Sequence, residues 1–179
     1  MDELIDILDE NEIKIGETAT RKEVHKKGLW HRAIVVALIN DNNQILLQQR
    51  SYNKEKNAGM WDISVAGHLS AGDTSKIGAI RELKEELNVD CTENELEYIL
   101  TYKDQRIIRE DFIENQFYDF YILNKKDIKI SDIVVQESEV EQVKYIDINE
   151  LKSMIDNNLI VERKIIYDSL FKYISEDII

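Results

Sequence analysis

The chain has 179 residues, of which 43% are hydrophobic and 33% charged, a balance that is typical of one folded domain and excludes a disordered chain. Its net charge of −13 argues against nucleic acid or an anionic membrane as a partner, and its single cysteine, Cys91, excludes an intrachain disulfide and a cysteine-cluster metal site. No apolar run is long enough to span a membrane and the acidic start MDELIDILDE lacks the features of a signal peptide, so we expect a cytoplasmic protein.

The first 28 residues predict a β-hairpin followed by a short helix. The stretch ELIDILDENEIKIGETA contains two strand-like segments on either side of an Asp-Glu-Asn turn. In TRKEVHKKG, Thr20 and Glu23 have the spacing of a capping box, and Gly28 marks the end of the helix. We expect residues 1–28 to be an extension that precedes the core of the domain at 29–160.

The next segments predict mainly strands. HRAIVVALIN and QILLQQR, joined by the turn DNN, predict a β-hairpin, and the lysine-bearing loop SYNKEKNAG leads to a short apolar strand, ISVAG. A helix is predicted over residues 74–88, with Asp73 or Thr74 as its N-cap. Strands are predicted at ELEYILTYK, NQFYDFYIL and EQVKYIDI, and helices near 148–157 and 162–175.

The order of these elements predicts the fold class. Strands and helices do not alternate regularly along the chain, which favours a mixed sheet over a purely parallel one. We therefore expect a single α/β (α+β) domain over residues 1–179, in which a mixed β-sheet lies between helices and a C-terminal helix occupies 161–179.

The helix at 74–88 carries the clearest chemical signal. At about 100° per residue, its apolar side is formed by Ile77, Ile80, Leu83 and Leu87. The opposite side carries three carboxylates, those of Glu82, Glu85 and Glu86. Like charges at helical spacing repel one another by roughly 0.2–0.5 kcal/mol per pair. Either solvent and salt screen them, or a bound Mg²⁺ or Mn²⁺ ion compensates them, helped by backbone carbonyls of the glycine-rich stretch VAGHLSAGD.

Residues 67–89 resemble the signature of the Nudix hydrolases, Gly-x5-Glu-x7-Arg-Glu-U-x-Glu-Glu-x-Gly-U, in which U is aliphatic. The matching residues are Gly67, Arg81, Glu82, Leu83, Glu85, Glu86 and Val89. Two positions differ: Asp73 replaces a glutamate but keeps its charge, and Asn88 replaces a glycine, where asparagine also tolerates the left-handed conformation. The resemblance implies the Nudix α/β/α sandwich and an Mg²⁺-dependent hydrolase, with Mn²⁺ as a possible substitute.

The resemblance also implies the roles of these residues. Four groups would hold the metal: the carboxylates of Glu82, Glu85 and Glu86 and the carbonyl of Gly67. The metal would neutralise oxygens of a diphosphate and lower the pKa of the attacking water. Glu85 is the first candidate for the base that accepts a proton from this water, with Glu114 and Glu139 as alternatives. Arg81 and Asp73 would hold the loop and the helix together.

A second resemblance is to isopentenyl-diphosphate isomerases, which share the Nudix fold. It lies in the segments RKEVHKKGLWHRA, QQRSYNKEKNAGMWDISVAGH and IENQF. Those isomerases hold a divalent metal with three histidines and two glutamates, and four of these positions are matched here by His25, His31, His68 and Glu114. This implies a possible second metal site, suited to Zn²⁺ or Mn²⁺. Three cations match those that bind the diphosphate in the isomerases, namely Arg21, Arg50 and Lys54.

The two catalytic positions of the isomerases are changed. Ala66 stands where they have a cysteine and Gln116 where they have a glutamate, and neither side chain can protonate or deprotonate carbon. The intact acidic helix therefore favours hydrolysis of a diphosphate linkage in a nucleoside diphosphate derivative or a related small metabolite. Two alternatives remain: an isomerase-like enzyme with a different acid–base pair, and a catalytically silent Nudix domain that binds a metabolite.

The sequence does not identify the substrate or the oligomeric state. Six aromatic residues are candidates for stacking on a nucleobase, although aromatics at such spacings more often belong to the core: Trp30, Tyr52, Trp61, Tyr102, Phe117 and Tyr118. The N-terminal hairpin and the C-terminal helix offer candidate surfaces for a homodimer.

Overall fold

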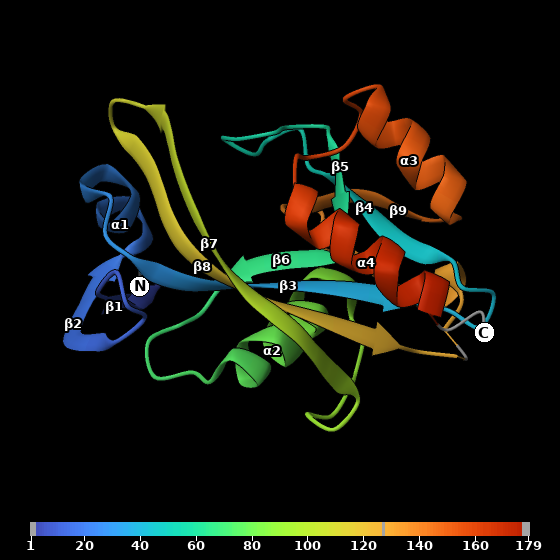
Figure 1. Ribbon diagram of the computed structural model, residues 1–179, viewed down its shortest axis with the longest axis horizontal. Coiled ribbons are helices and arrows are strands. Elements are labelled where there is room, and N and C mark those ends of the chain that lie inside the picture. Colours follow the sequence, from blue (N-terminus) through green and yellow to red (C-terminus); the bar gives the residue numbers. More distant parts are fainter. Residues whose placement is uncertain (1–2, 127, 177–179) are drawn as a thin grey trace.

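The computed structural model describes residues 3–126 and 128–176, and its centre is a seven-stranded mixed sheet (Figure 1). The strands of this sheet are β3 (His31–Ile39), β4 (Ile45–Arg50), β5 (Trp61–Ile63), β6 (Val65–His68), β7 (Leu96–Arg109), β8 (Phe112–Asn124) and β9 (Val140–Ile146). Their order is β5-β4-β3-β8-β7, with β6 also paired to β3 and β9 to β4. β3 and β8 run parallel, whereas the other pairs are antiparallel. The predicted mixed sheet is confirmed.

Helices cover both faces of this sheet (Figure 1). Alternate residues of β3 point to opposite sides, because side chains alternate along a strand. Ile34 and Val36 belong to a core shared with α2 (Ser75–Leu87), whereas Val35 and Ala37 belong to a core shared with α3 (Ile148–Asp156) and α4 (Lys164–Glu176). The predicted sandwich of helix, sheet and helix is therefore confirmed. Residues 177–179 of the predicted C-terminal helix lie outside the described residues.

The predicted hairpin between β3 and β4 opens just beyond its turn. Among the described residues only Ile39 and Ile45 pair directly across it. Ser64 bridges the gap, since its hydroxyl accepts a hydrogen bond from the Leu38 N–H at 2.8 Å and donates one to the Leu46 carbonyl. The segment ISVAG, predicted as one strand, is consequently two strands, β5 and β6, which pair with β4 and β3 respectively on either side of Ser64.

The N-terminal hairpin and its helix form as predicted. β1 (Leu4–Leu8) and β2 (Lys14–Thr20) are antiparallel, and α1 (Arg21–Lys27) begins at a capping box between Thr20 and Glu23. Gly28 ends the helix with φ = 61°, a conformation that favours glycine. The Asn115 side-chain amide donates to the Gly28 carbonyl at 2.7 Å, which holds the end of α1 against β8.

The helix α2 begins and ends as predicted, but its apolar side is displaced. Thr74 is the N-cap and Asn88 ends the helix with φ = 56°. Ile77, predicted to be buried, is 45% exposed, whereas Gly78 and Ala79 are buried. A Cβ on Gly78 would lie 3.1 Å from Leu69 Cγ, so the loop before the helix packs closely at this point. In the described part of the chain, no helix has the length and apolarity needed to cross a membrane.

Candidate active site

A cavity of about 860 Å³ collects nearly all the side chains that the sequence singled out. It is bordered by α1, the loop between β4 and β5, the end of β6, α2, and the hairpin of β7 and β8. The predicted residues that line it are Gly67, Arg81, Glu82, Glu85, Glu86, Arg21, Arg50, Lys54, His25, His68, Glu114 and Glu139. Residues from both ends of the chain thus meet at one site.

Of the three glutamates on the acidic side of α2, Glu86 is buried and Glu82 is largely buried. The Glu86 residue is 6% exposed and the Glu82 side chain 12%, whereas the Glu85 side chain is 53% exposed. Burial raises the pKa of Glu86 to about 8 and that of Glu82 to about 7, and the charge of Glu82 adds to the effect on Glu86. Screening by solvent, one of the two explanations for this acidic side, therefore does not suit Glu82 and Glu86, because α2 turns both side chains into the cavity.

Arg81 connects the loop before α2 to the helix itself. Its guanidinium donates to Glu82 at 3.0 Å and Glu85 at 3.3 Å. It also donates to the His68 carbonyl at 3.0 Å and to Asp73 at 3.4 Å. The Arg81 guanidinium thereby holds the carboxylates of Glu82 and Glu85 close to the end of β6.

Gly67 leaves the space that the Glu82 carboxylate occupies. A Cβ built on Gly67 would lie 2.4 Å from Glu82 Cδ and 2.5 Å from Glu82 Oε1, closer than atoms can approach. Nearby, the Gln48 amide donates to Glu86 at 3.1 Å, while its buried Oε1 has no hydrogen-bond partner among the described residues. The cavity wall thus offers one buried and one largely buried carboxylate, an unpartnered amide oxygen and a glycine backbone, which are oxygen donors that suit Mg²⁺ or Mn²⁺.

The alternative base candidates are tied to lysines. Glu139 forms an ion pair with Lys54, and buried Glu114 forms one with Lys56. Both lie on the cavity wall, as Glu85 does. Of the three, Glu85 is the candidate that lies on the acidic helix itself.

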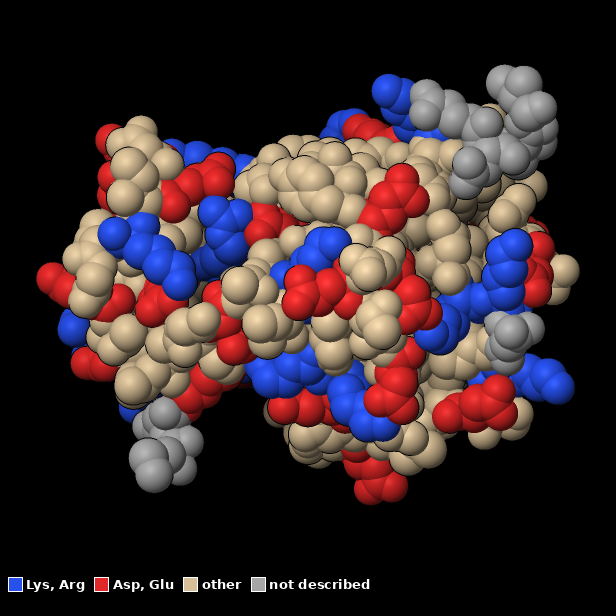
Figure 2. All heavy atoms as spheres, turned by 90° about the horizontal axis from the view of Figure 1, so that it is seen from below, with Lys and Arg blue, Asp and Glu red and all other residues tan. Residues whose placement is uncertain are grey.

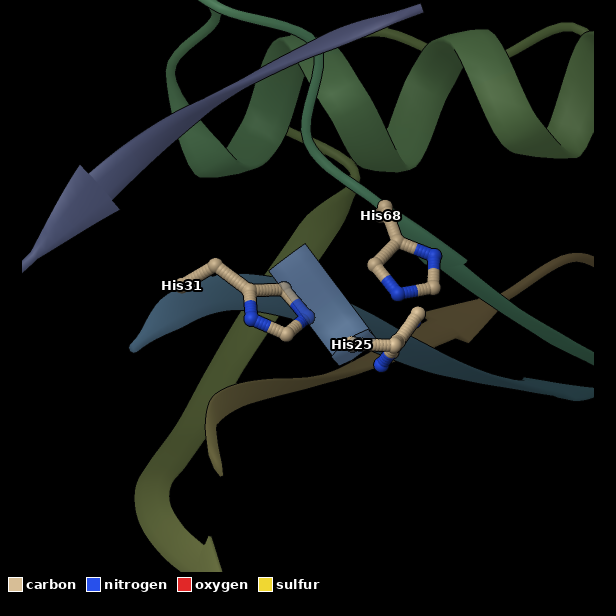
Figure 3. A group of neighbouring side chains, drawn as sticks. All are labelled: His25, His31 and His68. Atoms are coloured by element: carbon tan, nitrogen blue, oxygen red, sulfur yellow. The ribbon is translucent and has the colours of Figure 1, made fainter. Parts of the chain in front are cut away.

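The three histidines converge, as Figure 3 shows, although they come from α1, β3 and β6. One ring nitrogen of each of His25, His31 and His68 lies within 4.8 Å of the others, and their ring centroids are 5.2–5.3 Å apart. Burial lowers the pKa of His31 to about 4 and also lowers the pKa values of His25 and His68, so all three are neutral at pH 7. Neutral, converging imidazoles suit a transition metal.

Gln116 lies inside this histidine cluster. Its side-chain nitrogen donates to His31 Nε2 at 2.9 Å and His68 Nε2 at 3.1 Å, and its oxygen accepts from the Tyr118 hydroxyl. His31 Nδ1 donates to the Leu29 carbonyl at 2.9 Å, which leaves His31 Nε2 as an acceptor. The amide hydrogens therefore point at two of the nitrogens that would bind a metal.

The remaining imidazole has a free nitrogen. His25 is buried, and His25 Nε2 has no hydrogen-bond partner in the described chain. An unpartnered buried nitrogen fits a metal ligand, but a metal bound by all three rings requires the Gln116 amide to turn away from His31 and His68. The histidines thus fit a metal, with Gln116 as a competitor for the same lone pairs.

The predicted substrate-binding cations differ in how far they are already engaged. Lys54 pairs with Glu139. Arg50 donates to the Lys56 carbonyl at 3.2 and 3.3 Å and approaches buried Asp62 to 3.7 Å, so it also holds the β4–β5 loop. Among the described residues Arg21 has no carboxylate partner, although it lines the cavity.

Sequence reasoning missed several cavity residues and overestimated the aromatic ones. Of the six candidate stacking residues, only Tyr118 lines the cavity. Gln48, Lys56 and Arg163 line it but were not predicted. Residues two apart in a strand point to the same face of the sheet. In QILLQQR, Leu46 packs in the core shared with α2, so Gln48 could have been predicted to face α2 as well.

A family model described as the NUDIX domain matches residues 29–168. The chain belongs to the Nudix family. It is 38% identical over 157 residues to Nudix hydrolase 3 of Arabidopsis thaliana, a match that covers 86% of this chain but 20% of the plant protein. It is 37% identical over 161 residues to an uncharacterised Nudix hydrolase of Clostridium acetobutylicum, with 88% of this chain and 76% of that protein covered.

The isomerase-like branch of the Nudix family is also represented among similar proteins. Isopentenyl-diphosphate Delta-isomerase 2 of Photorhabdus laumondii is 29% identical over 88% of this chain and 84% of its own length. A Deinococcus radiodurans protein superimposes with a TM-score of 0.72 at 18% identity, covering 93% of this chain and 97% of its own, which supports the fold alone. Both predicted resemblances are therefore confirmed at the level of family and branch.

Proposed function

We propose that this Nudix protein is a hydrolase that cleaves a diphosphate linkage in a small metabolite with the help of Mg²⁺, or of Mn²⁺ in its place. The observation that carries the proposal is a pair of carboxylates on a cavity wall beside Gly67, that of Glu86 buried and that of Glu82 largely buried. Glu86 forms no ion pair within the described residues, and its side-chain hydrogen bond comes from the neutral Gln48 amide, so a bound cation would stabilise its ionised form.

The residues of the cavity would have different roles in hydrolysis. Glu82, Glu85, Glu86 and the Gly67 carbonyl would hold the divalent ion. When bound, such an ion supplies charge to the phosphate oxygens and acidity to the attacking water. Arg81 holds the carboxylates of Glu82 and Glu85 next to the His68 carbonyl through its hydrogen bonds. Gln48 orients the Glu86 carboxylate.

Glu85 is our first choice for the group that accepts the proton of the attacking water. Its carboxylate is more exposed than those of Glu82 and Glu86, which leaves it open to solvent water. Glu139 and Glu114 would have to leave Lys54 and Lys56 to act in its place. These ion pairs instead place two lysines at the site, where Lys54, with Arg21 and Arg50, would bind the diphosphate.

The histidine cluster is a second candidate metal site, suited to Zn²⁺ or Mn²⁺. The unpartnered nitrogen of His25 favours it, and the Gln116 amide opposes it. Glu114, the fourth predicted ligand, lies in the same cavity but pairs with Lys56.

A substrate panel tests the hydrolase against its two alternatives. It contains nucleoside di- and triphosphates, nucleotide sugars, dinucleotide cofactors and isoprenoid diphosphates, each assayed with Mg²⁺ and with EDTA. We expect at least one compound to release phosphate or a monophosphate only with Mg²⁺, and Glu86→Gln to reduce that turnover at least ~100-fold. Isopentenyl diphosphate in deuterated water should give no allylic product. If no compound in the panel is cleaved but at least one binds measurably, the result would favour a catalytically silent Nudix domain.

A further inference from the structure

The aromatic rings that line the cavity are already covered. Phe112 stacks on His25 at a centroid distance of 4.4 Å, and the Arg109 guanidinium lies 5.1 Å from the same ring. Tyr118 stacks on Tyr102 at 5.1 Å. Among the described lining residues the only other aromatic rings are the imidazoles of His25 and His68, which contact each other, and the aliphatic side chains are small, namely Ala33, Ala66 and Val161. The cavity therefore offers neither a free ring for a nucleobase nor a deep apolar wall for a prenyl chain.

Cations are concentrated in this cavity. Ten of the 23 lysines and arginines of the chain line it, compared with nine of the 36 aspartates and glutamates. On the face shown in Figure 2, residues of both signs lie interspersed. In a protein with a net charge of −13, a cavity wall on which cations are as numerous as carboxylates suits an anionic ligand.

The least engaged of these cations lie on one face of α1. Lys22 and Lys26 are one helical turn apart and both line the cavity. Within the described residues neither forms an ion pair, whereas Lys27 on the same helix pairs with Glu23 at 3.5 Å. The two cavity lysines thus remain available for an anion.

The histidine cluster separates these lysines from the acidic helix. The His68 carbonyl is bonded to Arg81 of α2, and the His68 ring lies 5.2 Å from the ring of His25 on α1. A ligand whose diphosphate lies against Glu86 would pass the histidines before it reaches Lys22 and Lys26. The cavity volume of about 860 Å³ accommodates a ligand of that extent.

We propose that the substrate is a diphosphate that carries a second anionic group, and that Lys22 and Lys26 bind this second group at the α1 end of the cavity. The chemistry points to a phosphate on a sugar-like body, because the walls are polar and cationic rather than aromatic or apolar. The inference rests on the proposed hydrolase function and specifies which diphosphates that function favours.

Matched substrates that differ by one phosphate test the inference. Two such pairs are coenzyme A with dephospho-coenzyme A, and NADPH with NADH; 5-phosphoribosyl 1-diphosphate and dimethylallyl diphosphate add a compact comparison. We expect kcat/KM with Mg²⁺ to be at least tenfold higher for the member with the additional phosphate. The selectivity should weaken as salt is raised, because exposed lysines are screened.

Variants on the same helix assign the effect to the two lysines. The double variant Lys22→Gln/Lys26→Gln should bring the selectivity close to one, mainly by raising KM for the members with the additional phosphate, and should change kcat/KM far less for the members without it. The control Lys27→Gln should keep the selectivity. Equal kcat/KM within all three comparisons, or full selectivity in the double variant, would overturn the inference while the hydrolase function stands. Cleavage of none of these compounds and of none in the wider panel would instead refute the hydrolase function, and the inference with it.

Discussion

Replacing Glu86 by glutamine should make the metal-free protein more stable while it removes the proposed activity. In the absence of metal, Glu86 is 6% exposed and burial raises its pKa from 4.5 to about 8. The folded state therefore holds a proton that the unfolded state releases above pH 4.5. Stability from this group is fully present below pH 4.5 and is lost as pH rises towards 8.

The size of this effect follows from the two pKa values. At ~1.4 kcal/mol per pH unit, the difference between 4.5 and about 8 corresponds to roughly 5 kcal/mol of lost stability at pH 8 and above. Glutamine does not ionise, and its amide keeps an acceptor for Gln48 and adds a donor that the unpartnered Gln48 Oε1 lacks. We expect Glu86→Gln to gain at least ~2 kcal/mol at pH 8.5 and less than ~1 kcal/mol at pH 5.

Urea unfolding at pH 5 and pH 8.5, in EDTA and in Mg²⁺, measures this difference. The wild type should be stabilised by Mg²⁺ at pH 8.5, as expected for a ligand that binds the folded state, whereas Glu86→Gln should not. Glu85→Gln is the matched control, since the Glu85 side chain is 53% exposed and its loss should leave the metal-free stability unchanged. A Glu86→Gln protein that is less stable than the wild type at pH 8.5 in EDTA would refute the reasoning.

Three further predictions concern metal binding. Because the pKa values of Glu82 and Glu86 are raised to about 7 and about 8, Mg²⁺ must displace protons when it binds. Calorimetry should therefore show the apparent dissociation constant of Mg²⁺ falling from pH 6 to pH 8 and levelling above pH 8. A dissociation constant that does not change with pH would contradict this prediction. Gly67→Ala would place a Cβ 2.4 Å from Glu82 Cδ and should raise the Mg²⁺ concentration for half-maximal activity at least ~10-fold, an effect that an unchanged titration would disprove. Gln116→Glu replaces the amide that competes for the histidine nitrogens by a carboxylate, and it should increase Zn²⁺ affinity at least ~10-fold in equilibrium dialysis. Equal Zn²⁺ affinity of the variant and the wild type would show that the histidines do not form a metal site.

The sequence was most informative where local chemistry decides the structure. The spacing of Thr20 and Glu23 and the asparagine at 88 predicted helix ends that depend on a few neighbouring residues. The convergence of the histidines was also predicted, but through a resemblance to the isomerases, since residues as distant as His25 and His68 share no local pattern.

Features that depend on distant packing were not predictable. Helical periodicity placed Glu86 opposite the apolar side of the helix but could not show that the β-sheet supplies Gln48 as a neighbour and that the carboxylate is buried. The opening of β3 away from β4 depends on Ser64, which replaces backbone pairing with two bonds from one hydroxyl. The place of Gln116 among the histidines likewise requires the register of β8 on β3, where Gln116 lies opposite His31.

Hydrolysis in ¹⁸O-labelled water tests most directly the claim that this cavity activates water against a diphosphate. A substrate identified in the panel is incubated with Mg²⁺ and the wild type, and the products are analysed by mass spectrometry. We expect one ¹⁸O atom in a phosphate group of the products for each bond cleaved, and at least ~100-fold slower incorporation with Glu86→Gln. Incorporation at the same rate in both proteins would contradict the account, because the reaction would then not depend on the acidic helix.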